Sequence, residues 1–256
     1  MADIRLETDE RLDYVNEKIS LIQKKDGLTF GTDAFLLAAF INQQKKDYAV
    51  EFGAGTGIIS LLLAERNKFS SIDAVEIQQD FYDVMVRNIA LNNLDIKIKA
   101  YCCDVRDIHN TLTDREADVV FSNPPYMLMN SGKRNESDRK YIARHEVCGN
   151  IDDFCRAAFR KLKHGGKYYC VWRPDRLTSL MSALRANRLE PKRILFVHSD
   201  LNSEPSMVLV SSTKGGAEGA RVLPPLFLYD AEANDNGSRV MTDKAKKIYE
   251  TMSFED

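Results

Sequence analysis

One segment limits the possible folds more than any other, because an apolar run, three closely spaced glycines and a second apolar run follow one another without a break. The first run is Tyr48–Phe52, the glycines are Gly53, Gly55 and Gly57, and residues 58–64 are apolar except for one serine. Glycine lets a chain turn sharply and lets its backbone approach a ligand where a Cβ would interfere. The segment therefore predicts a buried strand, a ligand-facing turn and a helix.

The same alternation continues along the chain. Further strands are predicted at 71–75, 96–101, 118–121, 167–172, 194–197 and 207–210, and helices at 34–41, 81–92, 150–163 and 174–187. A regular order of strand and helix implies a parallel sheet that is covered on both faces. The loop at 199–206 is too short for a crossover helix, so the last strand should run antiparallel. We expect an α/β fold, doubly wound around a mostly parallel seven-stranded sheet.

The flanks of this pattern are less regular. Residues 1–30 are predicted to form an N-terminal arm, either irregular or a short helix, because Leu12 to Ile22 shows only rough helical spacing. Residues 31–213 should form the main domain, and 214–256 a small C-terminal extension packed on it. Within the extension, residues 226–229 suit a strand and 241–252 suit a helix.

Two local features set expected helix ends. Thr32 or Asp33 is expected to cap the helix that begins at Ala34, because both side chains can accept from orphan backbone N–H groups. Gly165 and Gly166 are expected to end the helix that begins at Asn150.

An acidic residue closes the strand that follows the glycine segment. Glu76 lies 19 residues after Gly57, where a carboxylate can accept both hydroxyls of a ribose. The glycine spacing differs from that of dinucleotide sites, and no other phosphate-binding element is evident, so S-adenosylmethionine fits better than NAD. Asp104 ends the next strand and can accept from an adenine amino group; helix capping by the same carboxylate is the alternative.

A second chemical motif, Asn123-Pro124-Pro125-Tyr126, follows the apolar strand that ends at Phe121. The prolines can continue neither strand nor helix, so an amide is held at the carboxyl end of a strand, where ligands of α/β sheets bind. The Asn123 side-chain oxygen and the Pro124 carbonyl can accept from one –NH2 group, and Tyr126 can stack on a flat group. This arrangement suits methyl transfer to a planar exocyclic nitrogen. A turn without chemical function is the alternative.

Charge is distributed unevenly along the chain. Residues 130–200 hold 16 lysines and arginines against 8 acids, whereas the remainder holds 20 against 30. The basic stretch opens with Lys133, Arg134, Arg139, Lys140 and Arg144. Such residues form either a solvated surface or a field that holds a nucleic acid. Charge alone supports the two interpretations equally.

Other classes of protein are disfavoured. The N-terminus has no signal-peptide core and no run of 18 apolar residues occurs, so a cytoplasmic location is expected. The five cysteines lack C-x-x-C spacing, which favours free thiols in a reduced compartment. No zinc or calcium spacing is present. We expect His109, His164 and His198 to be structural or exposed, with His145 kept as a candidate substrate contact.

Together these segments resemble class I S-adenosylmethionine-dependent methyltransferases, and Asn123–Tyr126 resembles their amino-methylating branch. Gly31–Ala38, Glu51–Gly57, Ala143–Glu146 and Pro224–Leu226 are, with that motif, similar to the bacterial tRNA1(Val) adenine-N6 methyltransferases. The resemblance covers roughly residues 12–250. Where Asp-Leu is commoner in the superfamily, this chain has Glu51 and Phe52, which keeps the acid.

The resemblance implies N6-methylation of the adenosine beside the anticodon by direct in-line transfer, with S-adenosylmethionine as cofactor and tRNA as partner. It implies no metal, no membrane and no obligate protein partner. The implied catalytic residues are Asn123, Pro124, Pro125 and Tyr126. The implied cofactor contacts are Thr32, Glu51, Gly53, Gly55, Gly57, Glu76, Asp104, Val105 and Asn123. The implied substrate contacts are Tyr126, Lys133, Arg134, Arg139, Lys140, Arg144 and His145.

Two alternatives stay open. A protein glutamine amide presents the same planar –NH2 group to the same motif, although a release-factor-type enzyme should carry a larger helical region before Gly27 than this sequence has. A non-catalytic module that binds the cofactor or RNA is the other, although pure binding does not require the Asn-Pro-Pro-Tyr geometry.

Overall fold

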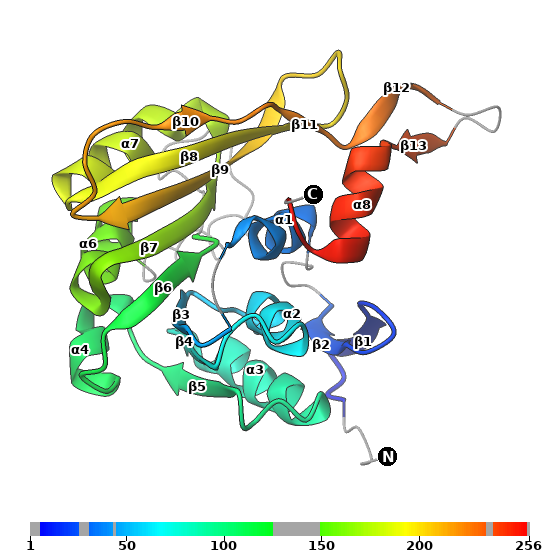
Figure 1. The fold of residues 1–256 in the computed structure, drawn as a ribbon. Helices are drawn as coiled ribbons and strands as arrows, with labels where there is room; N and C mark the ends of the chain where they lie inside the picture. The colour runs from blue at the N-terminus through cyan, green and yellow to red at the C-terminus, as the bar shows by residue number, and fades with distance from the viewer. Residues whose placement is uncertain (1–5, 26–30, 43–44, 125–148, 234–237, 255–256) are drawn as a thin grey trace, which may run out of the picture.

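The computed structural model describes residues 6–25, 31–42, 45–124, 149–233 and 238–254, with the side chains of 231–233 excepted. Within these residues nine strands form one large twisted sheet, and helices cover both of its faces (Figure 1). None of the described helices is long and apolar enough to cross a membrane.

The centre of the sheet is parallel, as predicted. Its parallel strands are β3 (Tyr48–Phe52), β4 (Ser71–Glu76), β5 (Ile98–Cys102), β6 (Ala117–Ser122), β7 (Leu162–Trp172) and β8 (Leu189–His198). β9 (Pro205–Lys214) lies between β7 and β8 and is antiparallel to both. The spatial order β8-β9-β7-β6-β3-β4-β5 confirms the mostly parallel α/β sheet with an antiparallel last strand.

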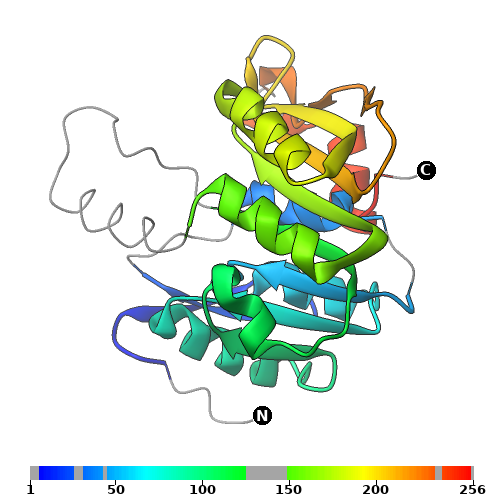
Figure 2. The same cartoon turned by 90° about the vertical axis from the view of Figure 1, so that its left-hand side faces the viewer.

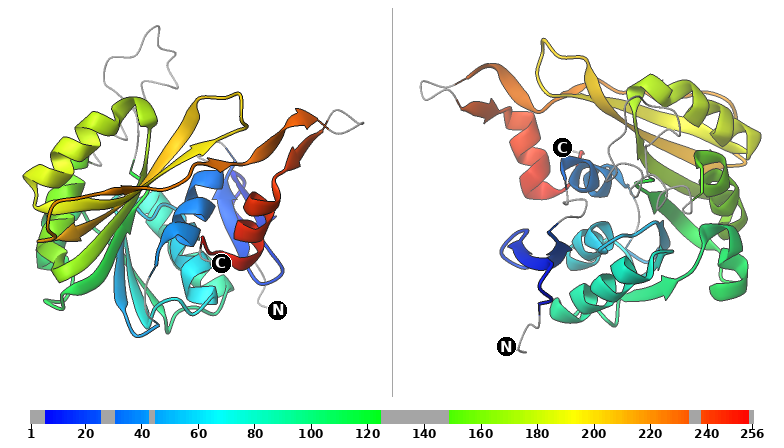
Figure 3. Two further views of the ribbon diagram at one scale, coloured as in Figure 1. Left: turned by 45° about the horizontal axis from the view of Figure 1, so that its top comes forward. Right: turned by 180° about the vertical axis from the view of Figure 1, so that it is seen from behind.

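The helices form two layers, which the views from the side and from behind show (Figures 2 and 3). On one face lie α1 (Thr32–Phe40), α2 (Ile58–Glu65) and α3 (Gln79–Leu91); on the other lie α4 (Ile108–Thr111), α6 (Ile151–Lys161) and α7 (Leu177–Ala186). Successive strand residues alternate between the two cores: Phe121 packs with the first layer and Val120 with the second. Burying a large apolar side chain contributes about 1.5–3 kcal/mol, so both layers stabilise the sheet.

The N-terminal segment is a β-hairpin, so the prediction of a helix or an irregular arm was wrong. Strand β1 (Glu10–Tyr14) pairs with β2 (Ser20–Lys24). The side chain of Asn16 accepts from the backbone N–H of Lys18 at 2.8 Å and of Ile19 at 2.9 Å, which shapes the turn.

The outer edge of β2 is completed by side chains of α3. The Asn88 amide exchanges hydrogen bonds with the Ile22 backbone at 2.7 and 3.0 Å, and Asn92 does the same with Ser20 at 3.0 and 2.8 Å. Asn88 also donates to the Thr56 carbonyl, at 3.0 Å. The two amides satisfy backbone groups that a neighbouring strand would otherwise pair, and they fasten the hairpin beside the glycine segment.

The chain after β9 widens the predicted seven-stranded sheet to nine strands. β10 (Arg221–Val222) and β11 (Leu226–Phe227) both pair with β8 in parallel. They are followed by the hairpin β12 (Tyr229–Ala233) and β13 (Arg239–Met241) and by helix α8 (Asp243–Thr251). The rings of Phe35 and Tyr249 stack at 4.4 Å, which joins α8 to α1.

Several element boundaries differ from expectation. Helix α1 begins at Thr32 after Gly31, without a side-chain cap. α6 ends at Lys161, and Gly165 and Gly166 lie inside β7, where the register against β6 shifts. Such an irregularity lets β7 start before its glycines. Finally, β5 begins at Ile98, because the chain turns at residues 94–97 and leaves the Ile96 side chain 96% exposed.

Candidate active site

The glycine segment forms a tight loop at the carboxyl end of β3. Gly53, Gly55 and Gly57 have φ values of 68°, 56° and 86°, a region that L-residues with a Cβ rarely adopt. A Cβ at Gly57 would lie 2.9 Å from the Met85 Cγ atom. Glycine is thus required both by the backbone conformation and by the close approach of α3.

The end of β4 holds this loop in place. Glu76 is 4% exposed, and its Oε2 atom accepts from the Gly55 N–H at 2.8 Å. Its Oε1 atom accepts from the Gln78 N–H at 2.8 Å. Burial raises the pKa of Glu76, while these backbone donors favour its ionised form. A carboxylate has about four acceptor sites, and the Ile77 N–H and the Gln78 side chain also interact with Glu76, so a ligand hydroxyl would replace one of these donors.

Glu51 lies beneath the loop rather than at its surface. It is 1% exposed, and its Oε2 atom accepts from the Ser60 N–H at 3.1 Å and from the Ser60 hydroxyl. Desolvation, together with the nearby charge of Glu76 and against the two bonds from Ser60, raises the pKa of Glu51 to about 8. Glu51 therefore joins β3 to the first turn of α2.

The raised pKa of Glu51 predicts a pH-dependent stability. The folded state binds its proton more tightly than the unfolded state, in which the carboxyl titrates at 4.5. The stabilisation is therefore complete below pH 4.5 and is lost as pH rises through about 8. We expect the free energy of unfolding to fall by roughly 4 kcal/mol across this range from Glu51 alone.

Urea unfolding between pH 5 and 8 measures this fall, and Glu51→Gln should flatten most of it. A smaller fall should persist in the variant, because burial also raises the pKa of Asp73 and of Glu76. An equally steep profile in both proteins would remove Glu51 as its cause.

Asp104 caps a helix, which was the alternative to an adenine contact in the sequence analysis. Its carboxylate begins the 3-10 helix η1 (Val105–Asp107) by accepting from the Arg106 N–H at 2.8 Å, and it also binds the Arg106 guanidinium. Burial opposes ionisation, but these bonds outweigh it and hold the pKa of Asp104 below its usual value. Asp104 and Val105 lie just beyond β5, next to the β4 end that carries Glu76.

Asn123 follows the last residue of β6, and its amide is oriented by α1. The Asn123 Nδ2 group donates to the Asp33 Oδ2 atom at 2.8 Å, across 90 residues of sequence. An ionised carboxylate only accepts, so the amide turns its nitrogen toward Asp33 and its oxygen away. The buried hydroxyls of Ser122 and Tyr168 lie 2.6 Å apart and join the end of β6 to the middle of β7. The expectation that Asp33 caps α1 was wrong.

We expect Asp33→Ala to lower kcat about 10- to 100-fold, since a hydrogen bond to a charged group contributes about 1.5–3 kcal/mol. Affinity for the cofactor should stay unchanged, and Asp33→Asn should recover part of the rate because its oxygen can still accept. Steady-state kinetics of both variants, with the cofactor dissociation constant as control, measure this. A kcat equal to wild type in Asp33→Ala would show that Asp33 does not position Asn123.

The sheet topology brings these groups together. The strand order β7-β6-β3-β4 sets Asn123, the glycine loop and Glu76 on adjacent strands at one edge. Neighbouring strands lie about 4.8 Å apart, so the carboxyl ends of β6 and β4 are separated by roughly 10 Å. This is the edge where open α/β sheets bind ligands.

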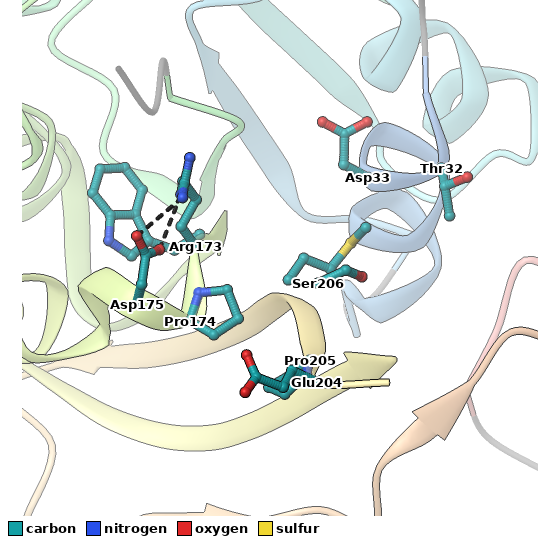
Figure 4. Close-up of a pocket in the computed structure, with 10 residues that line it drawn as sticks. Thr32, Asp33, Arg173, Pro174, Asp175, Glu204, Pro205 and Ser206 are labelled. Carbon is teal, nitrogen blue, oxygen red and sulfur yellow. Dashed lines mark hydrogen bonds and ion pairs between the residues drawn. The ribbon is translucent and has the colours of Figure 1, made fainter. Parts of the chain in front are cut away.

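A pocket of about 630 Å³ opens at the same edge (Figure 4). Its walls are Thr32 and Asp33 at the start of α1, residues 172–175 after β7, and residues 204–207 at the start of β9. Asp33 connects the Asn123 amide with the pocket, because it accepts a hydrogen bond from Asn123 and also lines the pocket. Arg173 is not among the residues predicted from the sequence, although its place directly after a parallel strand is a usable signal.

Several expected site residues lie outside the described residues. These are Pro125, Tyr126, Lys133, Arg134, Arg139, Lys140, Arg144 and His145. Other cations of the basic stretch are described and have intramolecular partners: Arg156 pairs with two aspartates of its own helix, Lys161 donates to the Thr113 carbonyl, and Lys163 pairs with Asp118. For these three, the structural interpretation is favoured over a nucleic-acid surface.

Comparison with solved structures shows the same fold elsewhere. The chain superposes on Atu636 of Agrobacterium tumefaciens, described as a predicted O-methyltransferase, with a TM-score of 0.70 and 19% identity over 88% of this chain and 98% of that one. It also superposes on TYW2 from M. jannaschii, solved in complex with AdoMet, with a TM-score of 0.53 and 15% identity over 82% and 87% of the two chains. These likenesses support a Rossmann-like α/β architecture.

The curated relatives found by sequence comparison carry the same name. The chain is 25% identical to the tRNA1(Val) (adenine(37)-N6)-methyltransferase of Dyadobacter fermentans, over 78% of this chain and 82% of the relative. It is 28% identical to the protein of that name from Bacteroides fragilis, over 74% and 78% of the two. The family model described as Methyltransferase small domain matches residues 24–187, which include the glycine loop, Glu76 and Asn123. The chain therefore belongs to the Methyltransferase small domain family.

Proposed function

We propose that this protein methylates the N6 amino group of an adenine in tRNA, using S-adenosylmethionine, and that its target is the adenosine beside the anticodon of tRNA1(Val). One observation of the structure carries the proposal: the Asn123 amide is oriented by Asp33 at the carboxyl end of β6, one strand away from the glycine loop. The names of the curated relatives support the choice of substrate.

The residues present suit the cofactor. The loop with three left-handed glycines lets a ligand approach the backbone, and a Cβ would not be accommodated at Gly57. Glu76 is fixed beside the loop where it can accept from ribose hydroxyls. We propose that Thr32, Asp104 and Val105 complete the site, and that the buried Glu51 supports the loop from beneath by binding Ser60. When bound, S-adenosylmethionine supplies a methyl group made electrophilic by its sulfonium.

The chain's own contribution to the reaction is to orient the acceptor nitrogen. The Asn123 side-chain oxygen and the Pro124 carbonyl accept from the two hydrogens of the target amino group and so aim its lone pair at the methyl carbon. Positive charge develops on this nitrogen, so both bonds strengthen in the transition state and lower the barrier. Holding the two reactants in line supplies the remaining gain. No general base is required, because the nitrogen releases its proton readily once it is methylated.

The structure also supports a proposal for how the chain is organised. We propose residues 31–213 as the catalytic domain, with the flanking segments as additions to it. The amides of Asn88 and Asn92 fasten the N-terminal hairpin, and the stacking of Phe35 on Tyr249 joins α8 to α1.

Labelled cofactor tests the proposed activity. The purified protein is incubated with methyl-labelled S-adenosylmethionine and either tRNA, protein extract or neither. We expect label in the tRNA only. Label in a protein glutamine would favour the glutamine alternative, and absence of label in all fractions would favour a binding module.

A further inference from the structure

The pocket beside Asn123 has a single cation on its wall, among the residues that the structure describes. Arg173 directly follows β7, and its Nε and Nη2 groups donate to Asp175 at 2.9 and 3.0 Å. The Arg173 side chain is 52% exposed. Figure 4 shows this pair on the side of the pocket that faces Thr32 and Asp33. The guanidinium is therefore accessible from the pocket.

The orientation of Arg173 is set before any ligand arrives. Asp175 occupies the edge of the guanidinium formed by Nε and Nη2, which leaves the end formed by Nη1 and Nη2 directed away from Asp175. That end can donate two parallel bonds to the oxygens of one phosphate. The supporting turn is rigid, because Pro174 fixes its own φ and the Trp172 indole N–H donates to the Arg176 carbonyl at 3.0 Å. Little entropy is lost when such a side chain binds.

The other charges of the pocket restrict what it can hold. Asp33 and Glu204 line the remaining walls, and Asp175 adds a third carboxylate. These acids repel a run of phosphates, but they can accept from ribose hydroxyls and from the amino groups of a base. A pocket of about 630 Å³ lies within the range of small-ligand sites, about 300–1,000 Å³. One phosphate with its sugar and base matches this lining.

The position of the pocket relates it to the reaction. The β7 and β9 ends lie on the side of β6 opposite to β3 and β4, which carry the glycine loop and Glu76. Asp33 separates the pocket from Asn123 and contacts both. An RNA strand that presents its target base at Asn123 therefore brings a neighbouring residue of the strand to the pocket.

We propose that this pocket binds one nucleotide adjacent to the target adenosine, with its phosphate on Arg173. The inference rests on the proposed function and adds to it a contact that distinguishes an RNA strand from a protein side chain. It assigns Arg173 to substrate binding and Asp175 to positioning the guanidinium.

The first test is Arg173→Gln, assayed with tRNA over a range of salt concentrations. We expect the apparent KM for tRNA to rise about five- to tenfold and the log–log salt slope to shrink by about 0.7–0.9, the loss of one phosphate contact. The kcat and the cofactor affinity should not change. Arg173→Lys keeps the positive charge but cannot donate two parallel hydrogen bonds. Its KM should therefore lie between those of wild type and Arg173→Gln. Arg185 is a 61% exposed arginine beside Glu190, at the start of β8. As a matched control, Arg185→Gln should have the KM and the salt slope of wild type.

The second test removes the charge of the phosphate instead of the charge of Arg173. tRNA is assembled around a synthetic segment in which one phosphate at a time, on either side of the target adenosine, is replaced by a methylphosphonate. At one position the difference in KM between wild type and Arg173→Gln should vanish, because each change removes the same contact.

The outcomes separate the two proposals. An unchanged KM and salt slope in Arg173→Gln, a loss confined to kcat, or a KM difference that survives every neutralised position would overturn the pocket assignment while wild-type tRNA methylation stands. If wild type labels protein and not tRNA, the proposed function itself is wrong.

Discussion

The Asn123→Ala variant is expected to lose about two to three orders of magnitude in kcat, the usual effect of removing one preorganised hydrogen bond to the transition state. The side-chain oxygen of Asn123 is proposed to accept from the target amino group while its nitrogen is held on Asp33 at 2.8 Å. Removing the amide deletes the acceptor but no part of the glycine loop. Single-turnover methyl transfer measures the loss.

Two controls define this result. Cofactor affinity and the urea midpoint of Asn123→Ala should stay close to wild type, which shows that the chemical step carries most of the loss. Asn123→Asp keeps two acceptor oxygens but cannot donate to Asp33 and faces a second carboxylate. It should therefore be nearly as slow as the alanine variant. A kcat within a factor of about five of wild type in Asn123→Ala would rule out the amino-methylation mechanism, since one preorganised bond contributes far more.

The Glu76→Ala variant is expected to bind S-adenosylmethionine more weakly by roughly 1.5–3 kcal/mol, the contribution of a hydrogen bond to a charged group. The substitution removes the proposed ribose acceptor and also the oxygen that holds the Gly55 N–H. The loop should therefore lose order at the same time. Isothermal titration calorimetry gives the dissociation constant directly.

Matched variants separate these contributions. Glu76→Gln retains an acceptor oxygen and should lose less affinity than the alanine variant. Asp95→Ala removes an exposed acid on the turn before β5 and should bind as wild type. Calorimetry that returns the wild-type dissociation constant for Glu76→Ala would place Glu76 outside the cofactor site.

The centre of the fold was predictable because its signals are local. Each strand from β3 to β9 contains a short, largely apolar segment, and the reversal into β9 follows from the length of one loop. The glycine loop and Glu76 were predictable for a related reason, since the carboxyl ends of parallel strands meet at one edge.

The features that escaped prediction depend on contacts between distant parts of the sequence. The hairpin β1–β2 is stabilised by Asn88 and Asn92, which lie 66 and 72 residues from their backbone partners, so nothing in its own spacing identifies it. β10 and β11 have two residues each, too few to produce a period of two. They form because the edge of β8 offers unpaired backbone groups.

The orientation of Asn123 has the same origin. The sequence predicts Asp33 as a helix cap, because a carboxylate near a helix start usually accepts from the first backbone N–H groups. Its actual partner follows β6, 90 residues away. Sequence alone therefore indicated the chemical group and its strand, but it could not indicate the residue that orients the group.

The most direct test of the central claim is to identify the methylated nucleoside. The protein is incubated with an unmodified tRNA1(Val) transcript and methyl-labelled S-adenosylmethionine, and the RNA is digested to nucleosides for mass spectrometry. We expect the label in N6-methyladenosine, at the single position beside the anticodon, and its loss with Asn123→Ala. Label in a different nucleoside, or an unlabelled transcript alongside a labelled protein, would contradict the account.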